Sequence, residues 1–191
     1  MIAGVLLAAG GARRFGSQKL VATFAGVPLV RHAAETLSRA TDSLLVVVGR
    51  DADAVRDSLR GIDAVIVENT DWSTGLASSI RCGVAGAPGD AEAIVVALGD
   101  QPGIGSAVIE RLIARWRESG LPIAAVRYRG QRGHPVLFDR SLYPEIAILE
   151  GDVGARGLID LSPDRVAYVD VDEPMPVDVD TLRDLDALGS G

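Results

Sequence analysis

The sequence has 191 residues, of which 48% are hydrophobic and only 4% aromatic, and its formal net charge at pH 7 is −7. A chain of this length is expected to form one domain, residues 1–191, that buries about 70% of its unfolded surface. The negative charge argues against nucleic acid or an anionic membrane as partners, because both need a basic face. One cysteine, the lack of a signal peptide and the lack of a long apolar run favour a cytoplasmic location.

The first expected strand, residues 2–8, runs into a loop that combines glycines with cationic side chains. Glycine lets successive backbone N–H groups approach one anion, and Arg13, Arg14 and Lys19 add positive charge there. Lys19 is the only lysine of the chain, and a compact ammonium binds phosphate differently from an arginine fork. The pattern predicts a phosphate cradle, with a basic surface loop as the alternative. The spacing fits neither a P-loop nor a dinucleotide-binding turn.

Short apolar runs then alternate with helical patterns, which is typical of a parallel sheet covered on both faces. The sequence therefore predicts a three-layer, doubly wound α/β fold with a mostly parallel sheet. The basic residues 127–132 are expected to form a loop. The further expected strands are residues 44–48, 64–67, 93–98, 123–126 and 136–138, and the expected helices cover 28–37, 52–59, 75–83, 108–116, 156–161 and 182–188.

Asp100 follows the most apolar of these strands. The carboxyl end of a central parallel strand is where open α/β sheets bind ligands. A carboxylate there is suited to Mg²⁺, a hard cation that accepts one or two protein carboxylates together with substrate phosphates. The alternative is a turn-forming role before Pro102.

Three later segments also carry residues suited to binding. His134 lies between Gly133 and Pro135, which favours an extended backbone, and it is either structural or in contact with a substrate. Residues 151–156 place two glycines at an expected helix start, where anions bind, although Asp152 serves equally well as a helix cap. Residues 177–180 alternate valine and aspartate, so they present one apolar and one acidic face.

Together these segments resemble the MobA-like NTP transferases. The first loop matches the family pattern Leu-Ala-Ala-Gly-x-x-x-Arg-Phe-Gly-x-x-Lys. Later matches are Asn-x-x-Trp-x-x-Gly-x-x-x-Ser from Asn69, Gly-His-Pro from Gly133, Gly-Asp-x-Gly-Ala-Arg from Gly151 and Asp-x-Asp-Thr from Asp178. Gln101 departs from the Asp-Met-Pro that is frequent in relatives. The resemblance covers nearly the whole chain and implies a nucleotide-diphospho-sugar transferase-like fold.

The resemblance assigns roles residue by residue. It implies catalytic roles for Lys19, Arg14 and Asp100, and metal binding by Asp100 and Asp180, with Asp178 as the less favoured alternative. For Trp72 a structural anchoring role is preferred. The implied nucleotide-binding residues are Ala8, Ala9, Gly10, Gly11, Arg14, Lys19, Asn69, Gly75 and Ser79, and the implied acceptor-binding residues are His134, Gly151, Asp152, Gly154 and Arg156.

The resemblance also implies the reaction. A Mg²⁺-dependent enzyme of this kind moves a nucleotide from an NTP to a phosphorylated acceptor and releases pyrophosphate. The residues Ala8-Ala9-Gly10 favour the cytidylyltransferase branch, which uses CTP and the molybdenum cofactor molybdopterin, and whose product serves a molybdoenzyme client. Three alternatives stay open: another phosphorylated acceptor, an NAD(P)H-dependent reductase, and a non-catalytic protein that binds the finished cofactor.

Overall fold

The computed structural model describes residues 1–10, 19–152, 154 and 156–188, and its centre is a seven-stranded sheet. The strand order is β5-β4-β1-β6-β8-β7-β9, and β8 runs antiparallel to both of its neighbours while the other pairs are parallel. The strands are β1 (Ile2–Ala8), β4 (Ser43–Val48), β5 (Val65–Glu68), β6 (Ala93–Leu98), β7 (Ile123–Tyr128), β8 (Gln131–Asp139) and β9 (Val166–Val171), and a separate two-stranded sheet pairs β2 (Thr23–Phe24) with β3 (Val27–Pro28).

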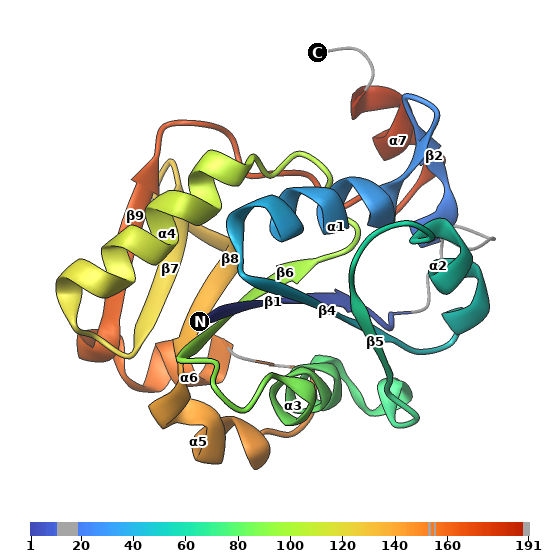
Figure 1. Ribbon diagram of the computed structural model, residues 1–191. Coiled ribbons are helices and arrows are strands. Elements are labelled where there is room, and N and C mark those ends of the chain that lie inside the picture. The colour runs from blue at the N-terminus through green and yellow to red at the C-terminus, as the bar shows by residue number, and fades with distance from the viewer. Residues whose placement is uncertain (11–18, 153, 155, 189–191) are drawn as a thin grey trace.

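Helices cover both faces of the sheet, which confirms the predicted three-layer α/β fold (Figure 1). One face is covered by α1 (Leu29–Ala40), α2 (Ala52–Ser58) and α4 (Ser106–Ser119), and the other by α3 (Leu76–Gly86), α5 (Tyr143–Ala147) and α6 (Arg156–Leu161). The terminal helix α7 (Leu182–Leu188) lies beside β2 (Figure 1). Short 3-10 turns complete the order at Lys19–Val21, Trp72–Thr74, Arg140–Leu142 and Pro163–Arg165.

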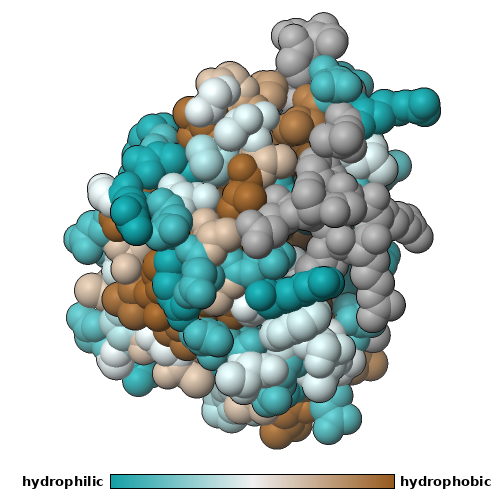
Figure 2. All heavy atoms as spheres, turned by 90° about the vertical axis from the view of Figure 1, so that its right-hand side faces the viewer, coloured by the Kyte–Doolittle hydropathy of each residue, from teal (hydrophilic) through white to brown (hydrophobic). Residues whose placement is uncertain are grey.

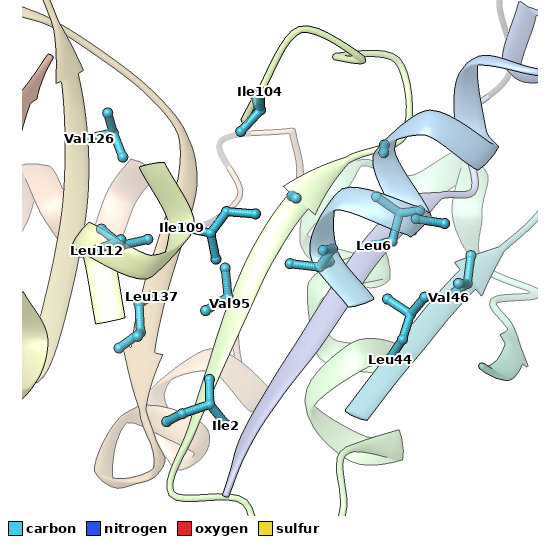
Figure 3. Close-up of a cluster of buried hydrophobic side chains, with 14 of the residues drawn as sticks. Ile2, Leu6, Leu44, Val46, Val95, Ile104, Ile109, Leu112, Val126 and Leu137 are labelled. Carbon is cyan, nitrogen blue, oxygen red and sulfur yellow. The ribbon is translucent and has the colours of Figure 1, made fainter. Parts of the chain in front are cut away.

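The core is aliphatic, as the composition requires. Every residue of β1 is buried, because this central strand has a helical layer on each side. Its alternate side chains enter two different clusters. Ile2 and Leu6 pack with α1 and α4 (Figure 3), whereas Val5 packs with α3. Burying this apolar surface is the main favourable contribution to folding.

The expected elements agree with the structure except in one region. The strand 93–98 and the helix 182–188 are found with the predicted bounds, and Gly120 closes α4 in the left-handed conformation, at a φ of 65°. The prediction of a loop at residues 127–132 is wrong. These residues extend β7 and begin β8, joined by a tight turn in which Arg129 and Gly130 have positive φ angles of 47° and 86°. A two-residue hairpin turn requires such angles.

The carboxyl ends of β1, β4 and β6 meet at one edge of the sheet, on the right of Figure 1. Figure 2 looks at this edge, where hydrophilic residues are interspersed with smaller apolar groups. In the part of the chain that the structure describes, no helix has the length and apolar character needed to cross a membrane.

Candidate functional site

The site lies where β1 and β6 end side by side. Leu7 pairs with Leu98, and the N–H of Gly99 donates to the carbonyl oxygen of Leu7 at 3.0 Å. The segments that follow the two strands are therefore held next to each other. They open on a cleft of about 570 Å³ that is lined by Leu7, Ala9, Gly10, Lys19, Leu20, Trp72, Ser73, Gly75, Leu76, Ser79, Leu98, Asp100, Asp152 and Asp180.

Lys19 is the electrostatic centre of this cleft. Its Nζ lies 2.7 Å from Oδ2 of Asp100 and 2.5 Å from Oδ1 of Asp180, although these residues are far apart in sequence. Lys19 is only 9% exposed. Burial disfavours its charged form, but the Asp100 and Asp180 carboxylates outweigh burial and raise the pKa of Lys19 above its ordinary value. The ammonium is therefore firmly charged at neutral pH.

The C-terminal tail brings Asp180 to Lys19. Val179 is fully buried against Leu29, and its N–H donates to the carbonyl oxygen of Asp100 at 3.1 Å. Beyond it, Thr181 and Asp184 cap the start of α7: the N–H of Thr181 donates to Oδ2 of Asp184 at 2.7 Å, and the N–H of Asp184 donates to Oγ1 of Thr181 at 3.2 Å. These contacts fix the backbone on both sides of Asp180.

Asp178, on the other side of Val179, contacts a residue that the sequence singled out only as a departure from the family pattern. Nε2 of Gln101 donates to Oδ1 of Asp178 at 2.6 Å. Partial burial raises the pKa of Asp178, opposed by the Gln101 hydrogen bond and reinforced by the nearby Asp100 charge. Gln101 is 5% exposed, and its position directly after Asp100 is the signal that points to it.

The carboxylates fit a hard divalent cation. Asp100 and Asp180 converge on one ammonium, so their oxygens are already within reach of a single positive charge. Carboxylate oxygen is the protein ligand that Mg²⁺ and Mn²⁺ prefer, and Mg²⁺ sites commonly use one or two carboxylates with substrate phosphates and water. Within the described residues there is no cluster of three or more His, Cys, Asp or Glu side chains arranged to hold a metal.

Of the predicted nucleotide-binding residues at the end of β1 and in the first loop, the structure describes Ala8, Ala9, Gly10 and Lys19. Ala9 is buried and lines the cleft, as does the exposed Gly10, whereas Ala8 is buried within the core. The predictions for Gly11 and Arg14 concern positions outside the described residues.

Asn69 lies directly behind Ser79, a residue that lines the cleft. Nδ2 of Asn69 donates to Oγ of Ser78 at 2.9 Å and to Oγ of Ser79 at 3.1 Å, and its Oδ1 accepts from the N–H of Asp71 at 3.0 Å. The Asn69 amide therefore ties the segment after β5 to the first turn of α3. Of the pair, Ser79 lines the cleft.

Gly75 and the segment 151–152 approach each other closely, and Gly75 and Asp152 form part of the rim of the cleft. A Cβ at Gly75 would lie 2.6 Å from the carbonyl oxygen of Gly151 and 2.6 Å from Oδ1 of Asp152, and Gly75 has a φ of 117°. The carbonyl oxygen of Gly151 also accepts from the N–H of Ala77 at 3.1 Å. Asp152, predicted to bind the acceptor, thereby lines the same cleft as Lys19.

The other predicted acceptor residues are not among those that line the cleft. Arg156 is exposed, with its Nε 3.8 Å from Oδ2 of Asp160, and Gly154 is buried against Leu76. His134 lies in β8 directly before the buried residues 135–138 of that strand. Its backbone oxygen accepts a hydrogen bond from the hydroxyl of Tyr128 at 2.9 Å. Burial lowers the pKa of His134, and within the described residues its Nδ1 is buried with no hydrogen-bond partner.

Comparison with known proteins places this site in a family. The model of the MobA-like NTP transferase domain matches residues 4–168. The chain is 36% identical over 193 residues to the nicotine blue oxidoreductase of Paenarthrobacter nicotinovorans. This match covers 96% of this chain and 94% of the oxidoreductase.

Solved structures agree with this placement. Rv0371c of Mycobacterium tuberculosis H37Rv is 33% identical, with a TM-score of 0.86 over 100% of this chain and 97% of the other. A structure of the same protein in complex with manganese gives a TM-score of 0.81 over 98% and 97%. A nucleotidyl transferase of Methanothermobacter thermautotroptrophicus, 24% identical, shares the fold with a TM-score of 0.83 over 98% of this chain and 95% of the other. The chain belongs to the MobA-like NTP transferase family.

Proposed function

We propose that this protein is a cytidylyltransferase that moves CMP from CTP to a phosphorylated acceptor and releases pyrophosphate, with molybdopterin as the acceptor. The observation that carries the proposal is the convergence of Lys19, Asp100 and Asp180 in the cleft that Ala9 and Gly10 also line, in a chain of the MobA-like family. A site for NTP chemistry needs a cation for the phosphates and carboxylates for a metal, and the ammonium of Lys19 and the carboxylates of Asp100 and Asp180 are suited to these roles.

In the proposed reaction an oxygen of the acceptor phosphate attacks the α-phosphorus of CTP. The new P–O bond forms as the bond to the β-phosphate oxygen breaks, and pyrophosphate leaves with the bonding electrons. Little covalent chemistry falls to the protein, so its residues align the reactants and balance charge. Lys19 is suited to neutralise charge on the phosphates, and the family resemblance adds Arg14 to this role.

Asp100 and Asp180 are the residues proposed to hold Mg²⁺, which when bound supplies positive charge to the triphosphate. The manganese complex of the 33% identical Rv0371c supports a divalent cation in this group of proteins. Val179 keeps Asp180 facing Asp100, so the buried tail serves the site by positioning that carboxylate. Gly75, by its close approach to Gly151 and Asp152, fixes the rim where the acceptor is proposed to enter.

The proposed preference for CTP rests on Ala9. This residue lines the cleft, and its methyl group narrows the space beside the end of β1 compared with the glycine usual in guanylyl-transferring relatives. A narrower slot favours a pyrimidine over a purine. The variant Ala9→Gly is therefore expected to bind GTP more tightly relative to CTP than the wild type does.

A second candidate is an NAD(P)H-dependent reductase, because a protein that is 36% identical over nearly its whole length carries the name nicotine blue oxidoreductase. The two candidates differ in their ligands. A reductase of this kind would bind NADPH without needing a divalent cation, whereas a cytidylyltransferase binds CTP with one.

A thermal-shift panel separates the candidates. CTP, GTP, ATP, UTP and NADPH are each added with and without Mg²⁺, with Asp100→Asn as the matched control. A ligand at 100 times its Kd stabilises the folded state by about 2.7 kcal/mol, which is ~5–11 °C in Tm for a chain of this size. The proposal expects the largest shift with CTP and Mg²⁺ and a reduced shift in Asp100→Asn. A shift with NADPH alone would overturn it.

A further inference from the structure

The same two carboxylates that are proposed to hold a metal are already paired with one ammonium of the protein itself. Oδ2 of Asp100 and Oδ1 of Asp180 face Nζ of Lys19 at 2.7 Å and 2.5 Å. A divalent cation that binds these two oxygens would stand next to the buried ammonium and be repelled by it. The carboxylates therefore serve Lys19 or a metal, but not both at full strength.

We infer that Lys19 is a built-in counter-ion, and that Asp100 and Asp180 bind a divalent cation strongly only when a polyphosphate draws the Lys19 ammonium away. The ligand class of the cleft is then the metal–polyphosphate chelate rather than the free metal or the free nucleotide. This inference rests on the proposed nucleotidyl transfer and adds to it the form in which the nucleotide is bound.

The charges around the cleft support this inference. Of the described residues that line it, Asp100, Asp152 and Asp180 are acidic and Lys19 alone is basic. A free polyphosphate would meet more negative than positive charge at these residues, and a free cation would meet the ammonium. The chelate offers metal to the carboxylates and phosphate oxygen to the lysine, so each charged group of the site gains an opposite partner.

The chemistry of lysine suits such an exchange. Its ammonium carries three donors on a flexible four-carbon stem, so it can turn from carboxylate to phosphate without a movement of the backbone. An arginine would hold the two carboxylates through a rigid planar fork. This chain uses arginine at every other basic position and lysine only at position 19.

The test measures metal binding rather than activity. Mn²⁺ is titrated into the wild type, Lys19→Met and the control Arg129→Met, and free Mn²⁺ is followed by electron paramagnetic resonance. The control removes one positive charge at an exposed turn, where Nε of Arg129 lies 3.2 Å from Oδ1 of Asp172. Each protein is titrated alone and with the non-hydrolysable analogue cytidine 5′-(α,β-methylene)triphosphate, and the Mn²⁺ that the analogue binds without protein is measured separately and subtracted.

We expect Lys19→Met to bind Mn²⁺ alone at least tenfold more tightly than the wild type and the control do. The analogue should tighten Mn²⁺ binding tenfold or more in the wild type and by less in Lys19→Met. The double variant Lys19→Met/Asp180→Asn should lose the gain in Mn²⁺ affinity, because the cation is expected to bind the Asp100 and Asp180 carboxylates. Circular dichroism verifies the fold of each variant.

Equal Mn²⁺ affinities of folded Lys19→Met and wild type overturn the inference, whatever the nucleotide does. The proposed function fails separately, if CTP with Mg²⁺ does not stabilise the wild type. If Lys19→Met binds Mn²⁺ tenfold more tightly than the wild type but the analogue changes the Mn²⁺ affinity of no protein, Lys19 is upheld as the counter-ion. The chelate is then overturned as the ligand of the cleft.

Discussion

The N–H of Val179 donates to the carbonyl oxygen of Asp100 at 3.1 Å, so the tail and the segment after β6 are joined beside Lys19. The family model ends at residue 168, yet the tail beyond it supplies Asp180 to the cleft. Val179 is 0% exposed, and Leu29, Phe24 and Leu185 surround it. Val179 thus anchors the tail, and the neighbouring Asp180 lines the cleft.

Replacing Val179 by alanine should loosen the tail. The change removes two buried methyl groups, which costs about 1–3 kcal/mol of stability. We expect a lower free energy of unfolding in urea and faster hydrogen exchange at residues 178–181. The matched control is Val177→Ala, because Val177 is 50% exposed and its truncation should stay within about 0.5 kcal/mol of wild type. Equal losses for the two variants would contradict the anchoring role.

Lys19→Ala and Asp100→Asn should each remove most of the cytidylyl-transfer activity while the protein stays folded. Each variant deletes one charge that balances or holds the triphosphate, and a lost electrostatic contact of this kind costs about 10²–10³ in rate. Pyrophosphate release at saturating CTP, Mg²⁺ and molybdopterin acceptor measures the effect, with far-ultraviolet circular dichroism as the check of folding. Near-wild-type turnover of either folded variant would refute its catalytic assignment.

Local patterns were enough to predict much of the fold, because they depend on neighbours along the chain. The apolar run 93–98 and the pattern at 182–188 predict their elements without any tertiary information. The hairpin at residues 127–132 was missed because its charged residues look like a loop. In the structure, Arg127 pairs with Asp170 on β9 at 2.8 Å, a partner that only the sheet order reveals.

The candidate site likewise has contacts that the sequence motifs predict and contacts that they do not. The motifs predicted that Lys19, Asp100 and Asp180 act together, and the structure brings these three side chains into contact. Neither the burial of Val179 nor the Gln101–Asp178 hydrogen bond could be predicted, because both depend on where the tail crosses the sheet edge. Contacts between residues this distant in sequence are set by tertiary packing rather than by local spacing.

Gly75→Ala should strain the rim of the cleft. Gly75 has a φ of 117°, and an added Cβ would lie 2.6 Å from the backbone of Gly151. An L side chain in this conformation costs about 1–3 kcal/mol before the clash is counted. We expect a lower Tm together with weaker CTP binding, because the backbone of Gly75, a predicted nucleotide-binding residue that lines the cleft, must move. The control Gly89→Ala adds its methyl to open space and should change neither quantity, so matching losses there would argue against a specific role of Gly75.

Asn69→Ala distinguishes a structural role from nucleotide contact. The Asn69 amide bonds to Ser78, Ser79 and the N–H of Asp71, so its loss removes three hydrogen bonds, one of them to the buried hydroxyl of Ser79, and costs about 1–3 kcal/mol. We expect a lower free energy of unfolding and a Kd for CTP within about threefold of wild type, measured by calorimetry, with exposed Thr70→Ala as the control. A large rise in Kd with unchanged stability would instead place Asn69 on the nucleotide.

His134 should make the protein less stable in mild acid. Burial lowers the pKa of His134, while the Val96 backbone and the Asp100 and Asp178 charges oppose the shift without cancelling it. The folded pKa is then below the unfolded value of about 6.5, so the unfolded state takes up a proton first as the pH falls. The contribution of neutral His134 to stability is full above about pH 6.5 and declines below it.

Urea unfolding at a series of pH values from 8 to 5 tests this sign. The free energy of unfolding of the wild type should fall more steeply below about pH 6.5 than that of His134→Asn, which has no imidazole to protonate at this position. The two proteins differ only at this position, so the difference between the two curves isolates His134. Parallel curves over the whole range would mean that the imidazole is as readily protonated in the folded chain as in the unfolded one.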